Sequence, residues 1–182
     1  MNSKVLVPIA DGFEEIEAMN IVDILRRAGA DVTLASVQGT QVKGAHGILL
    51  TADQKISDCL ENSYDLIALP GGSQGAENLR DSKEVVELLK KQKDFGKYYA
   101  AICASPAVVF AHHGLLEGVQ ATCYPSCAPM MPKGSFVDNP VVVDGTCITS
   151  QGPATATLFA LKLVEVLLGK DKAGSIASDL LL

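Results

Sequence analysis

The segment Tyr98–Val109 constrains the fold more than any other part of the chain. It begins as an apolar strand that ends at Cys103, and a helix is predicted to start directly after it. Ser105 has a side chain suited to cap that helix, and Pro106 fits the first helical position because its missing N–H would have no partner there. Small residues on both sides of the cysteine are what a sharp strand-to-helix elbow needs. The segment therefore predicts an α/β fold in which Cys103 turns out of the sheet.

The same junction predicts a reactive thiol. Cys103 is expected to meet the free N–H groups and the positive end of the following helix. Both favour the thiolate, and a helix N-terminus can bring a cysteine pKa from about 8.5 to roughly 3.5–7.5. The alternative is a buried, unreactive cysteine at the end of a strand, which is the more common environment for this residue.

Length and composition indicate one domain, residues 1–182, with a net charge of −6. The acidic balance argues against nucleic-acid binding, and no apolar run is long enough to span a membrane. We expect a cytoplasmic or organellar protein rather than a secreted one. No signal-peptide pattern precedes the first strand, and the five cysteines lie mainly in apolar runs rather than in a disulfide framework.

Apolar strands alternate with helices along the chain, as in a parallel sheet covered on both faces. Strands are predicted at Lys4–Ala10, Asp31–Val37, Tyr64–Leu69 and Val119–Tyr124, followed by a hairpin over 141–150. Helices are predicted from about 11 to 28, over 82–93, from Cys103 to about 112 and over 153–168, with a weaker helical tail to 182. Residues 38–52 are expected to form a hairpin-like excursion with His46 as a surface residue.

The first helix carries a carboxylate on its inward face. Glu17 lies four residues before Ile21 on the apolar stripe, so it is either at the rim in water or partly buried with a raised pKa. Asp11 and Glu14 have the spacing of a capping box, which accounts for Glu14. Glu15 is expected to point into solvent.

A glycine-rich turn over residues 70–75 follows the strand Tyr64–Leu69. Its paired glycines, Gly71 and Gly72, let the backbone approach a ligand closely and aim N–H groups at an anion. The alternative is a tight turn without a ligand. In a parallel sheet this turn and Cys103, at the end of the next strand, are neighbours at the edge where ligands bind.

Neither a metal nor a cofactor is expected. Cys123 and Cys127 could be half of a zinc site, but no second pair or nearby histidine completes four ligands. The glycine turn has the spacing neither of a phosphate loop nor of a dinucleotide fingerprint. The candidate functional groups are therefore a thiol, a carboxyl and backbone N–H donors.

Five motifs in register resemble the ThiJ/PfpI superfamily, and specifically its branch of Parkinson-associated deglycase-like proteins. They are GxEExE at 12–17, LRRAG at 25–29, LPGG at 69–72, AAICA at 100–104 and TSxGP at 149–153. The resemblance implies a flavodoxin-like three-layer α/β sandwich with a mostly parallel central sheet and a nucleophile-elbow cysteine. It also implies a homodimer built partly on the first helix.

The resemblance assigns roles to individual residues. Cys103 is the implied nucleophile and Glu17 the carboxyl that hydrogen-bonds its sulfur, a role that requires Glu17 to keep or share a proton. The other implied site residues are the oxyanion and backbone positions Gly71, Gly72 and Ala104, the supporting residues Tyr124 and Ser105, and Arg27, which would approach the partner's site across the dimer.

Two positions depart from the pattern of the superfamily. Protease-like members have a histidine directly after the nucleophile, where this chain has Ala104. A Cys-His protease needs a base within hydrogen-bond reach, so proteolysis is disfavoured. Several deglycase-like relatives have a histidine where this chain has Tyr124, and tyrosine is a poor base near neutral pH. With no histidine at either position, Glu17 is the residue left to act as general acid and base.

The leading hypothesis is a cofactor-free cysteine enzyme of the glyoxalase or deglycase type. It would act on reactive dicarbonyls such as methylglyoxal, or on their early adducts with protein and nucleotide groups, through a hemithioacetal on Cys103 with Glu17 as proton shuttle. The alternative is a redox-sensing, stress-protective chaperone whose Cys103 is oxidised to the sulfinate. A purely structural domain would need the cysteine, the carboxylate and the glycine turn to converge by chance, and it ranks last.

Overall fold

A seven-stranded sheet forms the centre of the computed structural model, which describes residues 2–182. Its strands are β1 (Lys4–Ile9), β2 (Asp31–Ser36), β5 (Gln54–Lys55), β6 (Leu66–Leu69), β7 (Tyr98–Ile102), β8 (Val141–Asp144) and β9 (Cys147–Ser150). They lie in the order β5-β2-β1-β6-β7-β9-β8; the β8–β9 pair is antiparallel and the other pairs are parallel. The predicted excursion is an antiparallel hairpin of β3 (Gln41–Lys43) and β4 (Leu49–Thr51).

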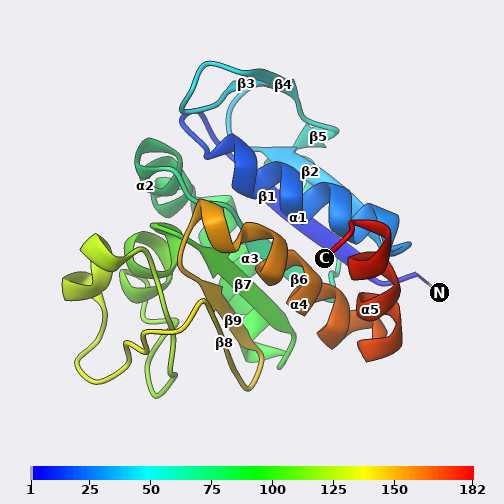
Figure 1. Ribbon diagram of the computed structural model, residues 1–182. Coiled ribbons are helices and arrows are strands. Elements are labelled where there is room, and N and C mark those ends of the chain that lie inside the picture. Colours follow the sequence, from blue (N-terminus) through cyan, green and yellow to red (C-terminus); the bar gives the residue numbers. More distant parts are fainter. Residues whose placement is uncertain (1) are drawn as a thin grey trace.

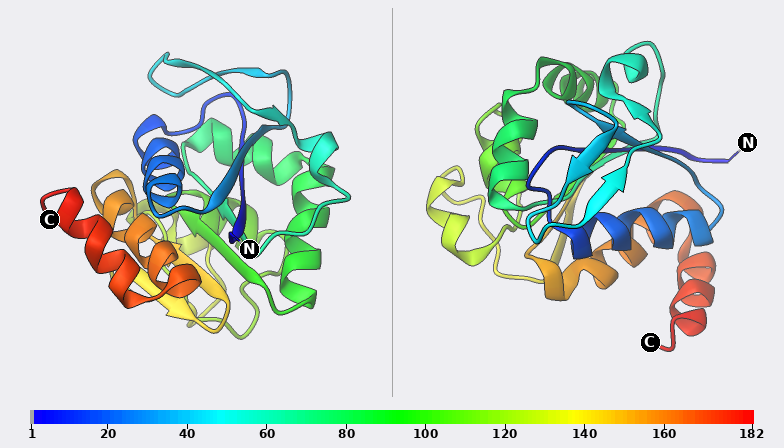
Figure 2. Two further views of the ribbon diagram at one scale, coloured as in Figure 1. Left: turned by 90° about the vertical axis from the view of Figure 1, so that its right-hand side faces the viewer. Right: turned by 90° about the horizontal axis from the view of Figure 1, so that it is seen from above.

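Helices cover both faces of the sheet. One face holds α1 (Glu15–Arg27), α4 (Ala156–Leu168) and α5 (Lys170–Asp179), and the other holds α2 (Ser73–Asp81), α3 (Lys83–Asp94) and the π-helical turn η2 (Pro106–Ala111) (Figure 1). The side views show α1, α4 and α5 together on one side of the sheet (Figure 2). The shorter turns are η1 (Ile56–Cys59), η3 (Pro125–Met130) and η4 (Pro153–Thr155). The predicted flavodoxin-like three-layer sandwich is confirmed.

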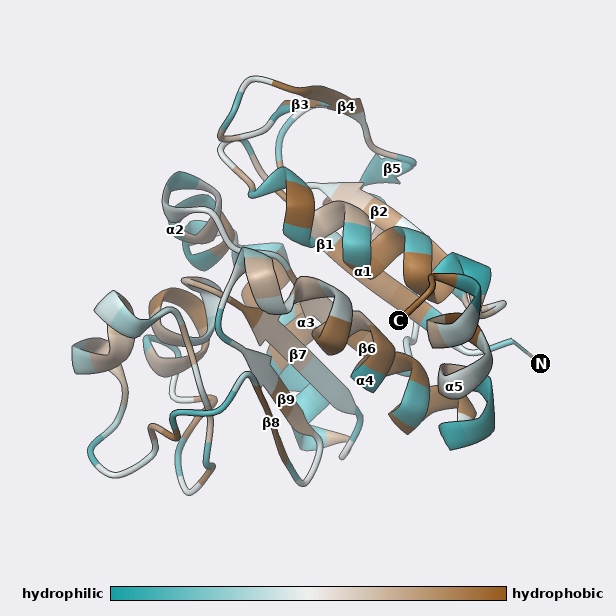
Figure 3. Cartoon of the chain, viewed as in Figure 1, coloured by the Kyte–Doolittle hydropathy of each residue, from teal (hydrophilic) through white to brown (hydrophobic). Residues whose placement is uncertain are grey.

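The side chains of β1 show why the sheet is buried on both faces. Val5, Val7 and Ile9 belong to the core beneath α1 and α4, while Leu6 belongs to the core beneath α2 and α3. Successive side chains of a strand point to opposite faces, so an uninterrupted apolar run fills both cores. Hydrophobic colours accordingly mark the central strands, and hydrophilic ones mark parts of α2 and α5 (Figure 3). Within residues 2–182, no helix combines the length and apolarity needed to cross a membrane.

Three local predictions are wrong. Asp11 forms no capping box with Glu14: its carboxylate accepts the Lys43 N–H instead, and α1 begins at Glu15 without a side-chain cap. Residues 119–124 make a single bridge, Ala121 with Phe136, and no regular strand. The glycine-rich turn is shorter than expected, because α2 already begins at Ser73.

Candidate active site

Cys103 occupies a strained elbow between β7 and η2. Its φ of +65° lies in the left-handed region that residues other than glycine rarely adopt. Two backbone hydrogen bonds hold it there: its N–H donates to the Ser150 carbonyl at 3.0 Å, and its own carbonyl accepts the Tyr124 N–H at 2.7 Å. The predicted nucleophile elbow is therefore present, and β9 and the segment before η3 support it from the side.

Two backbone amides point at the sulfur of Cys103. The N–H groups of Gly72 and Ala104 lie where they can donate to the Cys103 thiolate, and each lowers the pKa of the thiol, although burial outweighs them. Gly72 has a φ of +87°, and a Cβ at this position would lie 2.2 Å from the Gly12 carbonyl oxygen. Only glycine therefore fits the bend that turns this amide toward Cys103.

Glu17 approaches the same sulfur from α1. It is fully buried, its Oε2 accepts the Gly71 N–H at 2.7 Å, and its carboxyl lies close enough to Cys103 for the thiol to lower the pKa of Glu17. Its buried Oε1 has no N–H or O–H partner among the described residues. The Gly71 amide is thus occupied by Glu17, and its assignment among the oxyanion and backbone positions stays a prediction.

Glu17 and Cys103 form a coupled pair that does not ionise together. Burial, with a smaller contribution from the charge of Glu14, raises the pKa of Glu17 to about 7. Burial first and the Glu17 carboxylate second raise the pKa of Cys103 to about 12, against the direction predicted from the helix terminus. Near neutral pH the first proton therefore leaves mainly from Glu17. The thiolate is the minor form of the singly protonated pair, in which the remaining proton lies on Glu17.

The supporting residues have different positions. Ser105 does not cap a helix: its buried hydroxyl donates to the Pro70 carbonyl at 2.5 Å and so ties the glycine turn to the elbow. Tyr124 is 46% exposed at the edge of the site. Arg27 lies at the other end of α1, paired with Asp23 at 2.6 Å, so it does not reach the site of its own chain. Its predicted approach to a partner's site stays a prediction.

A cavity of about 740 Å³ opens onto Cys103. Its walls come from three parts of the chain: the loops around Gly12 and Gly44, the turn from Gly72 to Gln74, and the segment from Tyr124 to Cys127. The sequence placed the glycine turn and Cys103 at one edge of the sheet, and this is where the cavity lies. The sequence does not predict the wall formed by the β3–β4 hairpin, because that wall depends on packing between segments distant in the chain.

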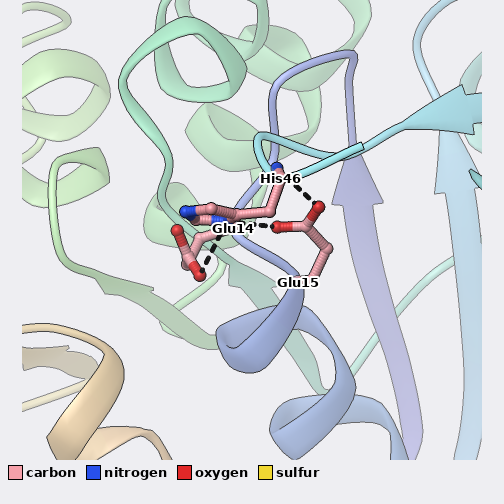
Figure 4. Close-up of side chains that lie close together, drawn as sticks. All are labelled: Glu14, Glu15 and His46. Atoms are coloured by element: carbon pink, nitrogen blue, oxygen red, sulfur yellow. Dashed lines mark hydrogen bonds and ion pairs between the residues drawn. The ribbon is translucent and has the colours of Figure 1, made fainter. Parts of the chain in front are cut away.

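Glu15 anchors that hairpin, so the prediction that it points into solvent is wrong. Its Oε1 accepts the His46 N–H at 2.7 Å, and its Oε2 bonds His46 Nδ1 at 3.0 Å (Figure 4). Burial raises the pKa of Glu15, but the hydrogen bonds from His46 and Ile48 outweigh it and lower the pKa overall; the same contact raises the pKa of His46. The pair joins the start of α1 to the loop that lines the cavity.

The same region contains a group of metal-type donors that the sequence analysis missed. One ligand atom each from Glu14, Glu15 and His46 lies within 4.8 Å of the others. Residues from two elements more than 30 positions apart give no local spacing signal. Both oxygens of Glu15 already accept hydrogen bonds from His46, and these bonds account for the arrangement without a metal.

Gly71→Ala is expected to disrupt the pair sterically. The added Cβ would lie 2.6 Å from the Cβ of Cys103 and 2.8 Å from Oε2 of Glu17, which is closer than real contacts allow. Such overpacking costs about 1–3 kcal/mol of stability and displaces the groups it touches. Urea unfolding and the rate of Cys103 alkylation measure both effects. Gly39→Ala, where nothing lies within 4 Å, is the matched control and should change neither; a Gly71→Ala protein with wild-type values would show that the site is looser than described.

The buried carboxyl of Glu17 makes stability depend on pH. Its pKa is 4.5 in its ordinary state and about 7 when folded, so its contribution is fully present below pH 4.5 and is lost as the pH rises through 7. The loss is roughly 3 kcal/mol, since one pKa unit corresponds to about 1.4 kcal/mol. Glu17→Gln, which is neutral throughout, is expected to lack this loss and to resist urea better than wild type at about pH 8. Equal pH slopes in the two proteins would assign the dependence to other groups.

Comparison with known proteins places this site in a family. Residues 3–166 match the model of the DJ-1/PfpI family. Protein DJ-1 homolog B of Arabidopsis thaliana is 46% identical over 170 residues, which are 93% of this chain and 39% of the relative. A Caenorhabditis elegans relative named glutathione-independent glyoxalase DJR-1.2 is 38% identical over 180 residues, 98% of this chain and 95% of that protein.

The fold comparison agrees with the sequence comparison. The solved structure of oxidized Toxoplasma gondii DJ-1 superimposes with a TM-score of 0.97 at 48% identity, covering 98% of each chain. The chain spans less than half the length of the two Arabidopsis relatives, 39% and 46%. The family match covers most of the chain and includes Glu17, the glycine turn and Cys103. The chain belongs to the DJ-1/PfpI family.

Proposed function

We propose that this protein is a cofactor-independent enzyme that converts reactive dicarbonyls to 2-hydroxy acids, with Cys103 as nucleophile and Glu17 as proton shuttle. The observation that carries the proposal is the environment of one sulfur atom. Two backbone N–H groups and a carboxyl that retains its proton up to about pH 7 meet at Cys103, at the wall of an open cavity.

The first step is addition of the Cys103 thiolate to the aldehyde carbon of the dicarbonyl. A carbon–sulfur bond forms, and the carbonyl electron pair moves onto oxygen. The N–H groups of Gly72 and Ala104 stabilise the thiolate before the step; once the sulfur is neutral, they are free to donate to the new oxyanion. The oxyanion then takes a proton from Glu17 and becomes a hemithioacetal.

Glu17 performs the second step as its carboxylate. It removes the proton from the carbon attached to sulfur and returns a proton to the neighbouring carbon by way of an enediolate. The product is a thioester of a 2-hydroxy acid, and water hydrolyses it to release the acid and Cys103. A pKa of about 7 suits a group that must both accept and give a proton near neutral pH.

The size of the cavity is compatible with two kinds of substrate. At about 740 Å³ it is much larger than a three-carbon dicarbonyl needs, which leaves room for an early adduct on a protein or nucleotide group. The name of the C. elegans relative supports turnover of the free dicarbonyl in this family.

The direct test is conversion of methylglyoxal to lactate by the purified protein, without glutathione and in the presence of a chelator. We expect lactate to form in the same amount as methylglyoxal is consumed. Loss of methylglyoxal without lactate would indicate scavenging by surface lysines and arginines rather than catalysis, and would reject the proposal.

A second candidate function is redox sensing with protection under oxidative stress. The carboxyl of Glu17 lies against the sulfur, and its Oε1 has no other donor or acceptor among the described residues. When protonated, this oxygen would donate a hydrogen bond to a sulfinate on Cys103. Mass spectrometry after peroxide treatment tests this role: a stable sulfinate with no dicarbonyl turnover would favour it over catalysis.

We also propose that the chain forms a homodimer through α1 and α4. Ile16 on α1 and Leu158 on α4 are each 54% exposed, and Asn20 bonds Thr157 between these helices, so the two apolar side chains belong to one packed pair of helices. Covering such side chains is a common reason for subunits to pair. Sedimentation equilibrium of wild type and Ile16→Glu tests this. We expect a dimeric wild type and a monomeric variant. The same mass for both proteins would contradict the proposed interface.

A further inference from the structure

A second cysteine faces the cavity of the candidate active site. Cys127 lines the cavity together with Cys103, and both thiols are free and partly exposed. The scheme for dicarbonyl turnover makes no use of Cys127. Two thiols on one cavity wall form a reactive pair once either of them is oxidised.

The backbone brings Cys127 close to the nucleophile. The Tyr124 N–H donates to the carbonyl of Cys103 itself, at 2.7 Å, and the Cys127 N–H donates to the Tyr124 carbonyl at 2.8 Å. Cys127 therefore lies one tight helical turn from a residue bonded to Cys103, in the turn η3 that packs against η2.

The turn that carries Cys127 has no fully buried residue, and it reaches the core beneath α2 and α3 only through the partly buried Cys127 and Ala128. None of the residues of η3 is buried, and Tyr124 before it is 46% exposed. Segments with little buried surface rearrange at low cost. Movement of η3 toward Cys103 would therefore expose no fully buried side chain of the turn.

The remaining cysteines do not have this access. Cys59 and Cys147 are buried in the core beneath α2 and α3. Cys123 is fully buried, although it is near enough to Cys127 for the charge of Cys127 to raise its pKa. Cys123 is thus the one internal competitor for Cys127, and it is shielded from solvent oxidants.

We propose that Cys127 is a resolving thiol, which captures oxidised Cys103 as an intramolecular disulfide and so switches the enzyme off reversibly. The oxidant is a hydroperoxide. This inference rests on the same reactive Cys103 as the proposed function, but it does not require dicarbonyl turnover.

The chemistry takes two balanced steps. The Cys103 thiolate attacks a peroxide oxygen: a sulfur–oxygen bond forms, the oxygen–oxygen bond breaks, and the leaving hydroxide takes a proton to become water. The Cys127 thiolate then attacks the sulfur of the Cys103 sulfenic acid, so that a disulfide forms and a second hydroxide leaves and is protonated. Two thiols and one peroxide become one disulfide and two waters. Without Cys127, a second peroxide converts the sulfenic acid to the sulfinic acid, which thiols do not reduce.

The test is to treat the fully reduced protein with an equimolar amount of hydrogen peroxide, alkylate the remaining thiols, and map the peptides without reduction. We expect a peptide that joins Cys103 to Cys127, loss of Cys103 alkylation, and recovery of it with dithiothreitol. In Cys127→Ala we expect Cys103 to be oxidised to the sulfinic acid instead, and dithiothreitol should not restore its alkylation. Cys123→Ala is the matched control and should form the same disulfide as wild type.

Other products would overturn the proposal. Wild-type protein that accumulates sulfinic acid at Cys103 while Cys127 stays alkylatable has no resolving thiol, and a Cys123–Cys127 or intermolecular disulfide assigns Cys127 another role. The mapping on wild-type protein decides this even if a variant does not fold. A protein that forms the Cys103–Cys127 disulfide but yields no lactate would retain this inference and lose the proposed enzymatic function.

Discussion

Cys103→Ala is expected to abolish the conversion of methylglyoxal to lactate, with a fall of at least about a thousandfold. The proposed scheme forms its covalent intermediate on this sulfur, and the Gly72 and Ala104 amides that would stabilise the oxyanion act on Cys103. Alanine keeps the Cβ, so the strain at a φ of +65° remains and the fold is preserved. The measurement is lactate formation, with thermal unfolding as the check on folding.

The control for this experiment is a cysteine outside the site. Cys147→Ala, in β9, removes a sulfur that is 1% exposed and should leave the rate per folded molecule unchanged. A Cys103→Ala protein that produced lactate at the wild-type rate would eliminate covalent catalysis at this position.

Glu17→Gln is expected to reduce turnover by about a hundredfold to ten-thousandfold, the usual contribution of a general acid and base. Glutamine keeps an oxygen to accept the Gly71 N–H and an N–H to donate to sulfur, so the geometry at Cys103 is preserved. It cannot take the proton from the hemithioacetal carbon. Oxidation of Cys103 by peroxide needs no such base and should persist in the variant, which mass spectrometry can follow in the same sample.

Asp23→Asn provides the comparison for a charge change on the same helix. Asp23 is exposed and paired with Arg27, far from the first turn where Glu17 lies, so turnover should be unaffected. If Glu17→Gln kept the wild-type turnover, the role of Glu17 as proton shuttle would be wrong.

Much of this site could be predicted because its parts follow local rules. The elbow at Cys103 follows from an apolar strand, small neighbours and a proline at the start of a helix. The place of Glu17 on the apolar stripe of α1 predicts its inward direction and leaves a rim or a buried position open; the structure shows it fully buried. The adjacency of the glycine turn and Cys103 follows from the order of strands in a parallel sheet, where β6 and β7 are neighbours.

The parts that were mispredicted depend on contacts between distant segments. Glu15 was expected in solvent because nothing in α1 shows that a loop 31 residues away supplies His46 as its partner. The pKa of Cys103 was expected to fall because the helix terminus is a local signal. Burial and the approach of Glu17 are tertiary effects, and they outweigh it. Ser105 likewise bonds Pro70, 35 residues away, rather than the adjacent helix.

The central claim is that Glu17 and Cys103 share a proton in a way that supplies a thiolate near neutral pH. The most direct test is the rate at which a thiol reagent alkylates Cys103 across the pH range. The measurement is made in the Cys127→Ala variant, so that alkylation of Cys127 does not contribute to the rate. We predict a rate that reaches a plateau with a midpoint near 7, where the pair loses its first proton, well below the roughly 8.5 of a free cysteine. A rate that keeps rising beyond about pH 9 with no plateau after pH 7 would show that loss of the first proton supplies no reactive thiolate, and would contradict the account.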